Sequence, residues 1–260
     1  MAKKTKLEKI AEKLAKVAQM VFPHAYKKYA WEYRAKHDLS LNADEVITMQ
    51  NARCNCGLSF TIDHRGKMQG MYSLSTSCVD NPICAERAKD PDSICFWCFA
   101  RRHIEAMPNN REPLAKNLEI LSSEIIEDVD LPIINAAWFR FESFGDLMNV
   151  TQAINYLNIV RKNPQTFFAW WTKNPAFIDL AFKLTGYEKP ANLNIIYSSP
   201  RYDEIGESTY WFVDKVFTVF SPKFLAEHPE IQINCGARSC LKCRLCYEKN
   251  NTRHVFEIRK

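Results

Sequence analysis

Cysteine is the residue type in this chain whose spacing most clearly indicates chemistry, and there are ten cysteines. Four of them form the run Cys235-x4-Cys240-x2-Cys243-x2-Cys246, which places four thiolates within twelve residues. Such a run can wrap around one metal centre, either a tetrahedral zinc ion or an iron–sulfur cluster. Zinc sites usually separate two C-x-x-C pairs by a dozen or more residues, so this compact spacing favours a cluster.

A second set lies earlier in the chain, in the pattern Cys84-x10-Cys95-x2-Cys98. Three cysteine ligands leave one position of a metal centre open, and a substrate or cofactor needs such a position in order to bind. Cys78 lies six residues before Cys84 and is a further candidate ligand. We therefore expect two metal centres, one closed and one open.

Other interpretations of the remaining cysteine patterns stay open. The Cys95–Cys98 pair could be a thioredoxin-like redox motif, but residues 90–93 have the composition of a loop, whereas that motif follows a strand. Cys54 and Cys56 form a C-x-C turn, and the sequence does not decide whether they are ligands or structural residues.

The charge of the chain is concentrated at its N-terminus. The formal net charge is +5, whereas residues 1–37 alone hold nine Lys, one Arg and three Glu. We expect this basic arm to be helical over residues 5–21 and 24–36. Its apolar stripe could dock on the core, or its lysines could contact nucleic acid.

The overall composition is that of an ordinary globular protein, with 47% hydrophobic and 25% charged residues. No apolar run approaches the roughly 18 residues of a membrane-spanning helix, and no export signal is visible. We therefore expect a cytoplasmic protein without a membrane partner.

Strand-like and helix-like segments alternate along most of the chain. We expect helices over 147–161 and 176–184, and strands over 71–77, 138–144, 166–171, 193–197, 216–220 and 231–234. Such an alternation indicates βα units and a parallel sheet. Six strands are fewer than the eight of a closed barrel, so we expect an α/β fold with a partial, open barrel. The expected domains are a basic helical arm (1–40), a barrel with a Cys-rich loop at 78–98 (41–234), and a C-terminal metal-binding segment (235–260).

Polar or sulfur-bearing residues follow each expected strand. Because the carboxyl ends of parallel strands meet at one edge of a sheet, we expect these side chains to converge there. Gly145 suits a tight turn that other residues do not tolerate. The pair Trp170-Trp171 is expected in the core. The residues at the strand ends are Cys78, Ser143 to Asp146, Thr172-Lys173, Ser198-Ser199, Ser221 and Cys235.

Several motifs together resemble the phage "gene product 88" family, whose function is uncharacterised. The resemblance covers roughly residues 68–250 and leaves the N-terminal arm outside. It rests on Cys78-x5-Cys84, Cys95-Phe-Trp-Cys98-Phe-Ala-Arg101, Arg140-Phe-Glu-Ser-Phe-Gly145-Asp146-Leu, Trp171-Thr-Lys-Asn-Pro175, Lys189-Pro-Ala-Asn-Leu193 to Ser198-Ser199, and the C-terminal cysteine run.

The same order of motifs is similar to phage-encoded radical-SAM-like proteins. That resemblance implies a partial (βα)6 barrel, a [4Fe-4S] cluster on Cys84, Cys95 and Cys98, and S-adenosylmethionine on the open iron. The chain departs from the usual C-x-x-x-C-x-x-C spacing, because ten residues separate Cys84 from Cys95. The four C-terminal cysteines resemble an auxiliary cluster.

The resemblance also implies which residues bind S-adenosylmethionine. Phe99 matches the aromatic residue that ends the cluster loop. Ser143, Gly145 and Asp146 match the position that meets the methionine amino group, and Lys173 and Ser198 match positions near the ribose and carboxylate.

Two functions are therefore expected as alternatives. The first is a phage- or prophage-encoded, radical-SAM-like iron–sulfur protein that uses S-adenosylmethionine on an unknown substrate in the bacterial host cytoplasm. The second is a zinc-stabilised module without catalysis, which binds nucleic acid or a protein through the basic arm.

Overall fold

The computed structural model describes residues 51–63 and 66–259, which belong to one compact unit, Gln50–Lys260. The expected helical arm at 1–40 lies outside the described residues. None of the helices in the described part is long and apolar enough to cross a membrane.

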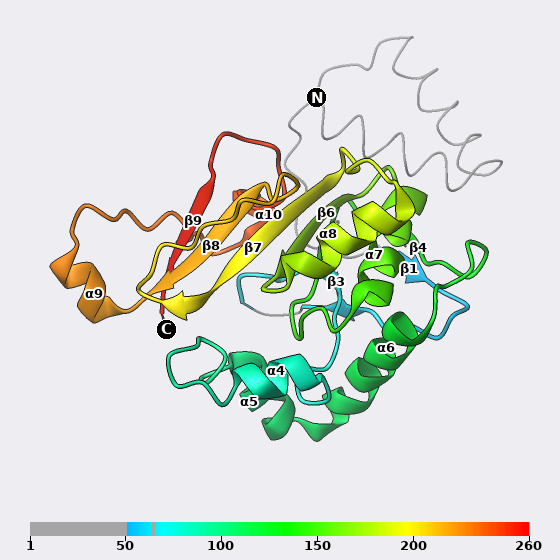
Figure 1. Cartoon of the computed structure of the whole chain (residues 1–260), viewed down its shortest axis with the longest axis horizontal. Coiled ribbons are helices and arrows are strands. Elements are labelled where there is room, and N and C mark those ends of the chain that lie inside the picture. Colours follow the sequence, from blue (N-terminus) through cyan, green and yellow to red (C-terminus); the bar gives the residue numbers. More distant parts are fainter. Residues whose placement is uncertain (1–50, 64–65, 260) are drawn as a thin grey trace, which may run out of the picture. The chain divides into compact units, whose positions relative to one another are not determined.

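A seven-stranded sheet forms the centre of this unit (Figure 1). Its first strand is antiparallel to the second, and the other six strands are mutually parallel and follow one another in chain order. The strands are, in spatial order, β2 (Thr61–Ile62), β3 (Tyr72–Leu74), β5 (Trp138–Phe141), β6 (Phe167–Thr172), β7 (Leu193–Tyr202), β8 (Lys215–Phe220) and β9 (His254–Ile258).

Helices occupy the connections between the parallel strands except the one from β7 to β8, which contains none. The long connection from β3 to β5 also contains β4 (Ile133–Asn135), which pairs antiparallel with β1 (Asn51–Arg53) in a separate two-stranded sheet. The helices are α4 (Pro82–Arg87), α5 (Phe99–Ala106), the 3-10 turn η1 (Pro108–Asn110), α6 (Arg111–Ser123), α7 (Val150–Lys162), α8 (Pro175–Thr185), α9 (Pro222–Glu227) and α10 (Cys240–Cys243).

The main core lies between the sheet and helices α7 and α8, which pack side by side over one face (Figure 1). Alternate strand residues point to that face, because successive side chains of a strand face opposite sides. Phe141 of β5 stacks on Tyr156 of α7, with ring centroids 4.3 Å apart. Phe168 and Trp170 of β6 are fully buried in the same cluster.

The opposite face of the sheet is covered by the C-terminal segment. Ala169 and Ile196 are fully buried on this face and form a second, smaller cluster with Tyr247. Cys240 and Cys246 pack against that cluster. The strand alternation therefore separates a helix-covered face from a face that meets the C-terminal cysteines.

The structure confirms a mixed α/β architecture, with strands at five of the six expected positions. The expected strand at 231–234 is wrong. This segment contacts β9 through the side chain of Asn234, whose carbonyl oxygen accepts a hydrogen bond from the Phe256 N–H at 2.8 Å. The sixth parallel strand is instead β9, which pairs with β8 over five residues and buries Val255 completely. The position beside β8 is therefore taken by the segment that buries more apolar surface, and not by residues 231–234, although these alternate as a strand does.

Two matched substitutions distinguish these segments by stability. Val255→Ala is expected to lower the free energy of unfolding by about 2 kcal/mol, because it removes fully buried methyl groups. Ile233→Ala is expected to cost less than about 1 kcal/mol, since Ile233 is only partly buried. Urea unfolding followed by circular dichroism measures both. A larger loss for Ile233→Ala would contradict the assignment of β9.

Candidate functional site

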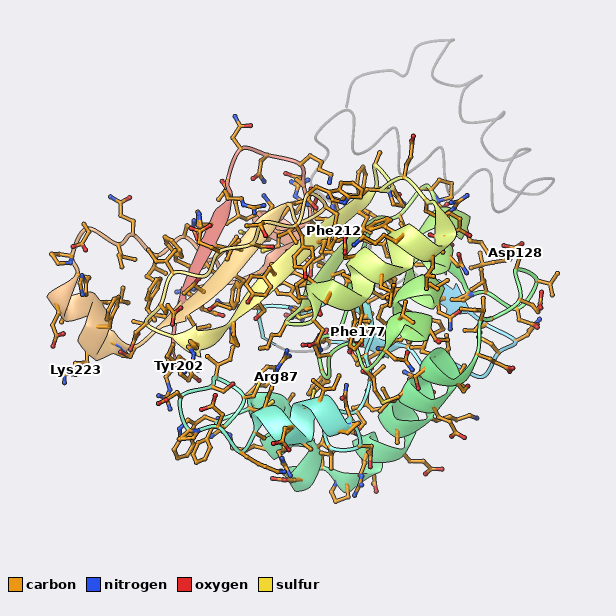
Figure 2. The ribbon with its side chains drawn as sticks, in the orientation of Figure 1. Arg87, Asp128, Phe177, Tyr202, Phe212 and Lys223 are labelled. Carbon is orange, nitrogen blue, oxygen red and sulfur yellow. A yellow bond between two sulfur atoms is a disulfide. The ribbon has the colours of Figure 1, made fainter. Side chains whose placement is uncertain are left out.

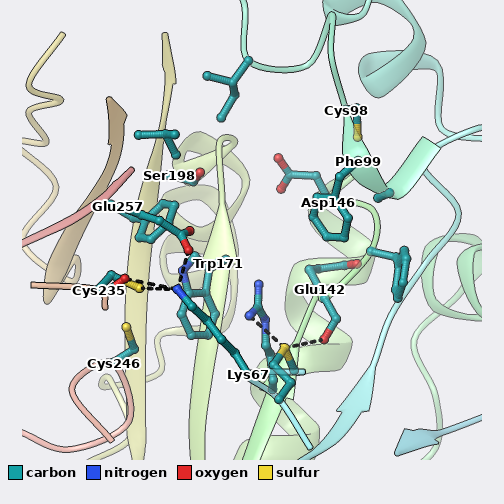
Figure 3. Close-up of a pocket in the computed structure, with 18 of the residues that line it drawn as sticks. Lys67, Cys98, Phe99, Glu142, Asp146, Trp171, Ser198, Cys235, Cys246 and Glu257 are labelled. Carbon is teal, nitrogen blue, oxygen red and sulfur yellow. Dashed lines mark hydrogen bonds and ion pairs between the residues drawn. The ribbon is translucent and has the colours of Figure 1, made fainter. Parts of the chain in front are cut away.

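A cavity of about 720 Å³ is lined by residues at the C-terminal ends of the parallel strands and by the C-terminal segment (Figure 3). Every residue expected from the sequence to bind a metal or cofactor lines it. In Figure 3, Cys98 and Asp146 approach from one side and Cys235 and Cys246 from the other, with Trp171 between them. The lining includes Cys78, Cys84, Cys95, Cys98, Ser143, Gly145, Asp146, Lys173, Ser198, Cys235, Cys240, Cys243 and Cys246.

The first cysteine set is carried by the connection that follows β3. Cys84 lies in α4, whose N-terminus is capped by the Asn81 side chain. Cys98 is the N-cap residue of α5. The loop before Cys95 is attached to β7, because the Ile94 N–H donates to the Pro200 carbonyl at 2.8 Å.

The surroundings of Cys98 stabilise a thiolate. A hydrogen bond from Cys78, backbone N–H groups of Arg101 and Ala100 at the start of α5, and the nearby Lys173 lower the pKa of Cys98 to about 6. The same hydrogen bond and burial raise the pKa of Cys78. Burial raises the pKa of Cys84 as well. The surroundings of Cys98 therefore favour its thiolate form, whereas those of Cys78 and Cys84 disfavour theirs.

The second cysteine set lies on the connection from β8 to β9. The Lys67 ammonium is 3.7 Å from Cys235 Sγ and also pairs with Glu257 at 2.6 Å. The Cys240 N–H donates to the Lys67 carbonyl at 2.6 Å. Burial raises the pKa of Cys246 to about 12, and the Arg140 guanidinium opposes that rise. Two cations thus face these sulfurs, Lys67 from the segment before β3 and Arg140 from β5.

Arg140 and Trp171 line the cavity, whereas the sequence gave no role to Arg140 and placed Trp171 in the core. The Arg140 guanidinium lies 3.9 Å from the centroid of the Trp171 ring, a cation–π geometry. Trp171 therefore lies on the cavity side, whereas its neighbour Trp170 is in the core as expected. The sequence did contain a sign of this position. Arg140 lies between Phe139 and Phe141, which face the helix-side core, so its own side chain points to the opposite face of β5.

Asp146 is buried and braces the ends of two strands. Its carboxylate accepts hydrogen bonds from the Thr172 hydroxyl at 2.6 Å and from the Lys173 N–H at 2.9 Å. It also pairs with Arg87 of α4 at 3.5 Å, and Figure 2 shows Arg87 between α4 and the strand ends. The carboxylate therefore fixes the geometry of the loop that it belongs to.

Gly145, directly before Asp146, occupies the left-handed region with a φ of 81°. A β-carbon at this position would collide with the side chain and carbonyl oxygen of Thr76. The turn therefore requires glycine. The neighbouring Ser143 N–H donates to the Ser75 hydroxyl at 3.0 Å, which ties the same turn to the end of β3.

Glu142 is a second buried carboxylate of the cavity, and no sequence argument singled it out. It accepts hydrogen bonds from the Tyr156 hydroxyl at 2.7 Å, from the Gln152 amide at 2.8 Å and from the N–H and hydroxyl of Thr76. Burial outweighs these bonds and raises the pKa of Glu142 to about 8, with a further rise from the Asp146 charge. Glu142 is thus a proton-holding group at the cavity wall.

Eight of the residues that line the cavity are cysteines, the residue type that zinc ions and iron–sulfur clusters take as ligands. Within residues 51–63 and 66–259, no three His, Cys, Asp or Glu side chains converge as ligands of a single ion do. Cys54 and Cys56 are joined in a disulfide and pack against the helix-side core. The structure thereby separates this pair from the eight cavity cysteines.

Comparison with known proteins gives one match. The family model described as Gene product 88 matches residues 42–244, which includes the first cysteine set and most of the second. No curated protein and no solved structure matches the chain.

The raised pKa of Glu142 predicts a pH-dependent stability. A carboxyl group whose folded-state pKa lies above its ordinary value near 4.5 favours folding in its neutral form, so its contribution is lost as pH rises through about 8. We expect the unfolding free energy of the wild type to fall between pH 5 and pH 8 relative to Glu142→Gln. Urea titrations across this range measure the difference.

The matched control is Glu119→Gln, which changes an exposed carboxylate on α6. Its stability is expected to follow the wild type at each pH. Parallel stability profiles for the wild type and Glu142→Gln would show that Glu142 does not titrate in this range.

Proposed function

The chain belongs to the phage Gene product 88 family, and we propose that this member is an iron–sulfur protein of the radical-SAM type. One observation carries the proposal. Two cysteine sets, separated by more than 130 residues of sequence, line one cavity, and cationic side chains face both. A structural role alone gives no reason for both sets to face the same cavity.

The sheet supports a partial (βα)6 barrel as the architecture. Its six parallel strands follow one another in chain order, as the strands of a barrel do, and helices lie in every connection except that from β7 to β8. The cavity lies at their C-terminal ends, where barrel enzymes bind their substrates. Its volume of about 720 Å³ falls in the range of small-molecule sites.

The places of the cysteines in the cavity support the assignment of one centre to each set. Cys84, Cys95 and Cys98 hold the open cluster, and Cys78 is the neutral thiol beside it. The four C-terminal cysteines hold an auxiliary cluster. A cubane places iron and sulfide between its thiolates, so its ligands do not converge on one point as the ligands of a single ion do.

The cations of the cavity offset the negative charge of thiolate-bound clusters. Lys173 acts on Cys84 and Cys98, whereas Arg140 acts on Cys240 and Cys246. Lys67 interacts directly with Cys235. Such compensation stabilises anionic sulfur in a half-buried site.

The loop around Gly145 and the side chains of Lys173 and Ser198 form the wall on which S-adenosylmethionine binds. Lys173 supplies the cation for its carboxylate. Asp146 already accepts several hydrogen bonds from the protein, so it orients this wall through Thr172, Lys173 and Arg87. When present, the open cluster supplies the electron for reductive cleavage of S-adenosylmethionine. The protein acts in the host cytoplasm.

Metal content tests this proposal. Protein purified without air is expected to contain about eight iron atoms and matching sulfide per chain, as two [4Fe-4S] clusters require. The double variant Cys95→Ala/Cys98→Ala should keep about half of the iron and lose the formation of 5′-deoxyadenosine. Iron and sulfide assays, together with chromatographic analysis of S-adenosylmethionine cleavage under reducing conditions, measure both.

The matched control is Cys54→Ala/Cys56→Ala, which removes two cysteines of the helix-side core. Iron content and cleavage should be unchanged in this variant. Two zinc ions without sulfide would replace the proposal with the zinc-stabilised module. Undiminished cleavage in the Cys95/Cys98 variant would remove the assignment of the open cluster.

A further inference from the structure

An aromatic and cationic surface lies at the rim of the cavity, beside the first cysteine set. We define the aromatic rim as Phe96, Trp97, Tyr202, Arg102 and Arg259. Phe96 and Trp97 lie between Cys95 and Cys98 and are 43% and 50% exposed. Trp97, Tyr202 and both arginines line the cavity.

Three segments distant in sequence form the aromatic rim. The loop of Phe96 and Trp97 is held to the end of β7 by an isolated bridge between Ser93 and Arg201. Tyr202 is the last residue of β7 (Figure 2). Arg259 follows β9, and its N–H donates to the Phe220 carbonyl at 2.7 Å. The rim is therefore a product of the fold and not of one flexible loop.

The arginines of the aromatic rim lie against its rings. The Arg259 guanidinium is 4.7 Å from the centroid of the Tyr202 ring and 5.9 Å from that of Trp97. Arg102 donates to the Trp97 carbonyl at 3.3 Å. The rings of Phe96 and Trp97 meet edge to face at 5.2 Å, and this arrangement leaves ring surface open to solvent.

Charge distinguishes these two arginines from their neighbours. Arg101 pairs with Glu105, and Arg201 lies near Asp90 and Asp92. Among the ion pairs of residues 51–63 and 66–259, none involves Arg102 or Arg259. Both guanidinium groups can therefore bind an external anion.

We propose that the aromatic rim binds single-stranded nucleic acid. Exposed rings that stack bases, combined with arginines that bind phosphates, are the features by which proteins hold unpaired strands. A ligand with phosphates and planar rings satisfies both parts of the surface, whereas an acidic protein satisfies only the arginines. Given the proposed function above, a nucleotide of this strand is the substrate that enters the cavity.

Binding is tested on the full-length protein by fluorescence anisotropy with a labelled oligothymidylate of twenty nucleotides. Trp97→Ala is expected to weaken binding by about tenfold, because stacking on one ring is lost. Arg259→Ala is expected to weaken binding less and to reduce its dependence on salt. The matched control is Trp211→Ala, which should leave binding unchanged. Trp211 is 65% exposed but packs on Phe182 of α8 and does not line the cavity.

A second probe separates stacking from charge. An abasic oligonucleotide of the same length keeps the phosphates and lacks the bases, so it should bind the wild type about tenfold more weakly than oligothymidylate. Against Trp97→Ala, the difference between the two probes should be smaller than against the wild type, because one of the stacking rings is lost. Equal binding of both probes to the wild type would indicate a site for any polyanion, such as an acidic protein, and would overturn the proposal.

Other outcomes also decide the proposal. Binding that neither Trp97→Ala nor Arg259→Ala weakens would place nucleic acid elsewhere on the chain, for example on the basic segment at 1–37. Absence of binding at low salt would overturn it outright. Iron measured in each variant keeps this test separate from the proposed function, because Arg259→Ala removes no cysteine. Loss of oligonucleotide binding with unchanged iron would support the aromatic rim alone.

Discussion

The geometry of the cavity depends on the hydrogen bonds and the ion pair that the Asp146 carboxylate makes. This carboxylate joins the end of β5 to the end of β6 through Thr172 and Lys173, and it joins both strand ends to α4 through Arg87. Because α4 carries Cys84, the position of a candidate ligand is coupled to the packing of the strands. The loop therefore has one arrangement in which all these partners are satisfied.

Buried charge sets a second constraint at the same place. Thiolates are costly to bury unless cations or hydrogen-bond donors compensate them. The structure supplies Lys173 and the N-terminus of α5 on one side of the cavity, and Arg140 and Lys67 on the other. The spacing of the cysteines suggested a metal site, and the cations around them provide the electrostatic environment that such a site needs.

Much of the fold could be predicted from local patterns. Alternating runs such as Trp138–Phe141 and Phe167–Thr172 are strands, and the helices expected after them are α7 and α8. The segment at 231–234 shows where such patterns fail. It alternates as a strand does, but pairing with β8 goes to His254–Ile258, because that segment buries Val255 and aligns along the whole strand.

By itself, the sequence predicted the candidate cysteine ligands, the parallel strands that alternate with helices and a tight turn at Gly145, because spacing and side-chain period are local properties. Only the tertiary structure decided that both cysteine sets face one cavity and that Cys54 and Cys56 do not. It also revealed Glu142 and Arg140, whose roles arise from partners distant in sequence. Such partners meet only when the strands and their connections are packed. Burial and pairing between distant segments depend on both segments and cannot be predicted from either one alone.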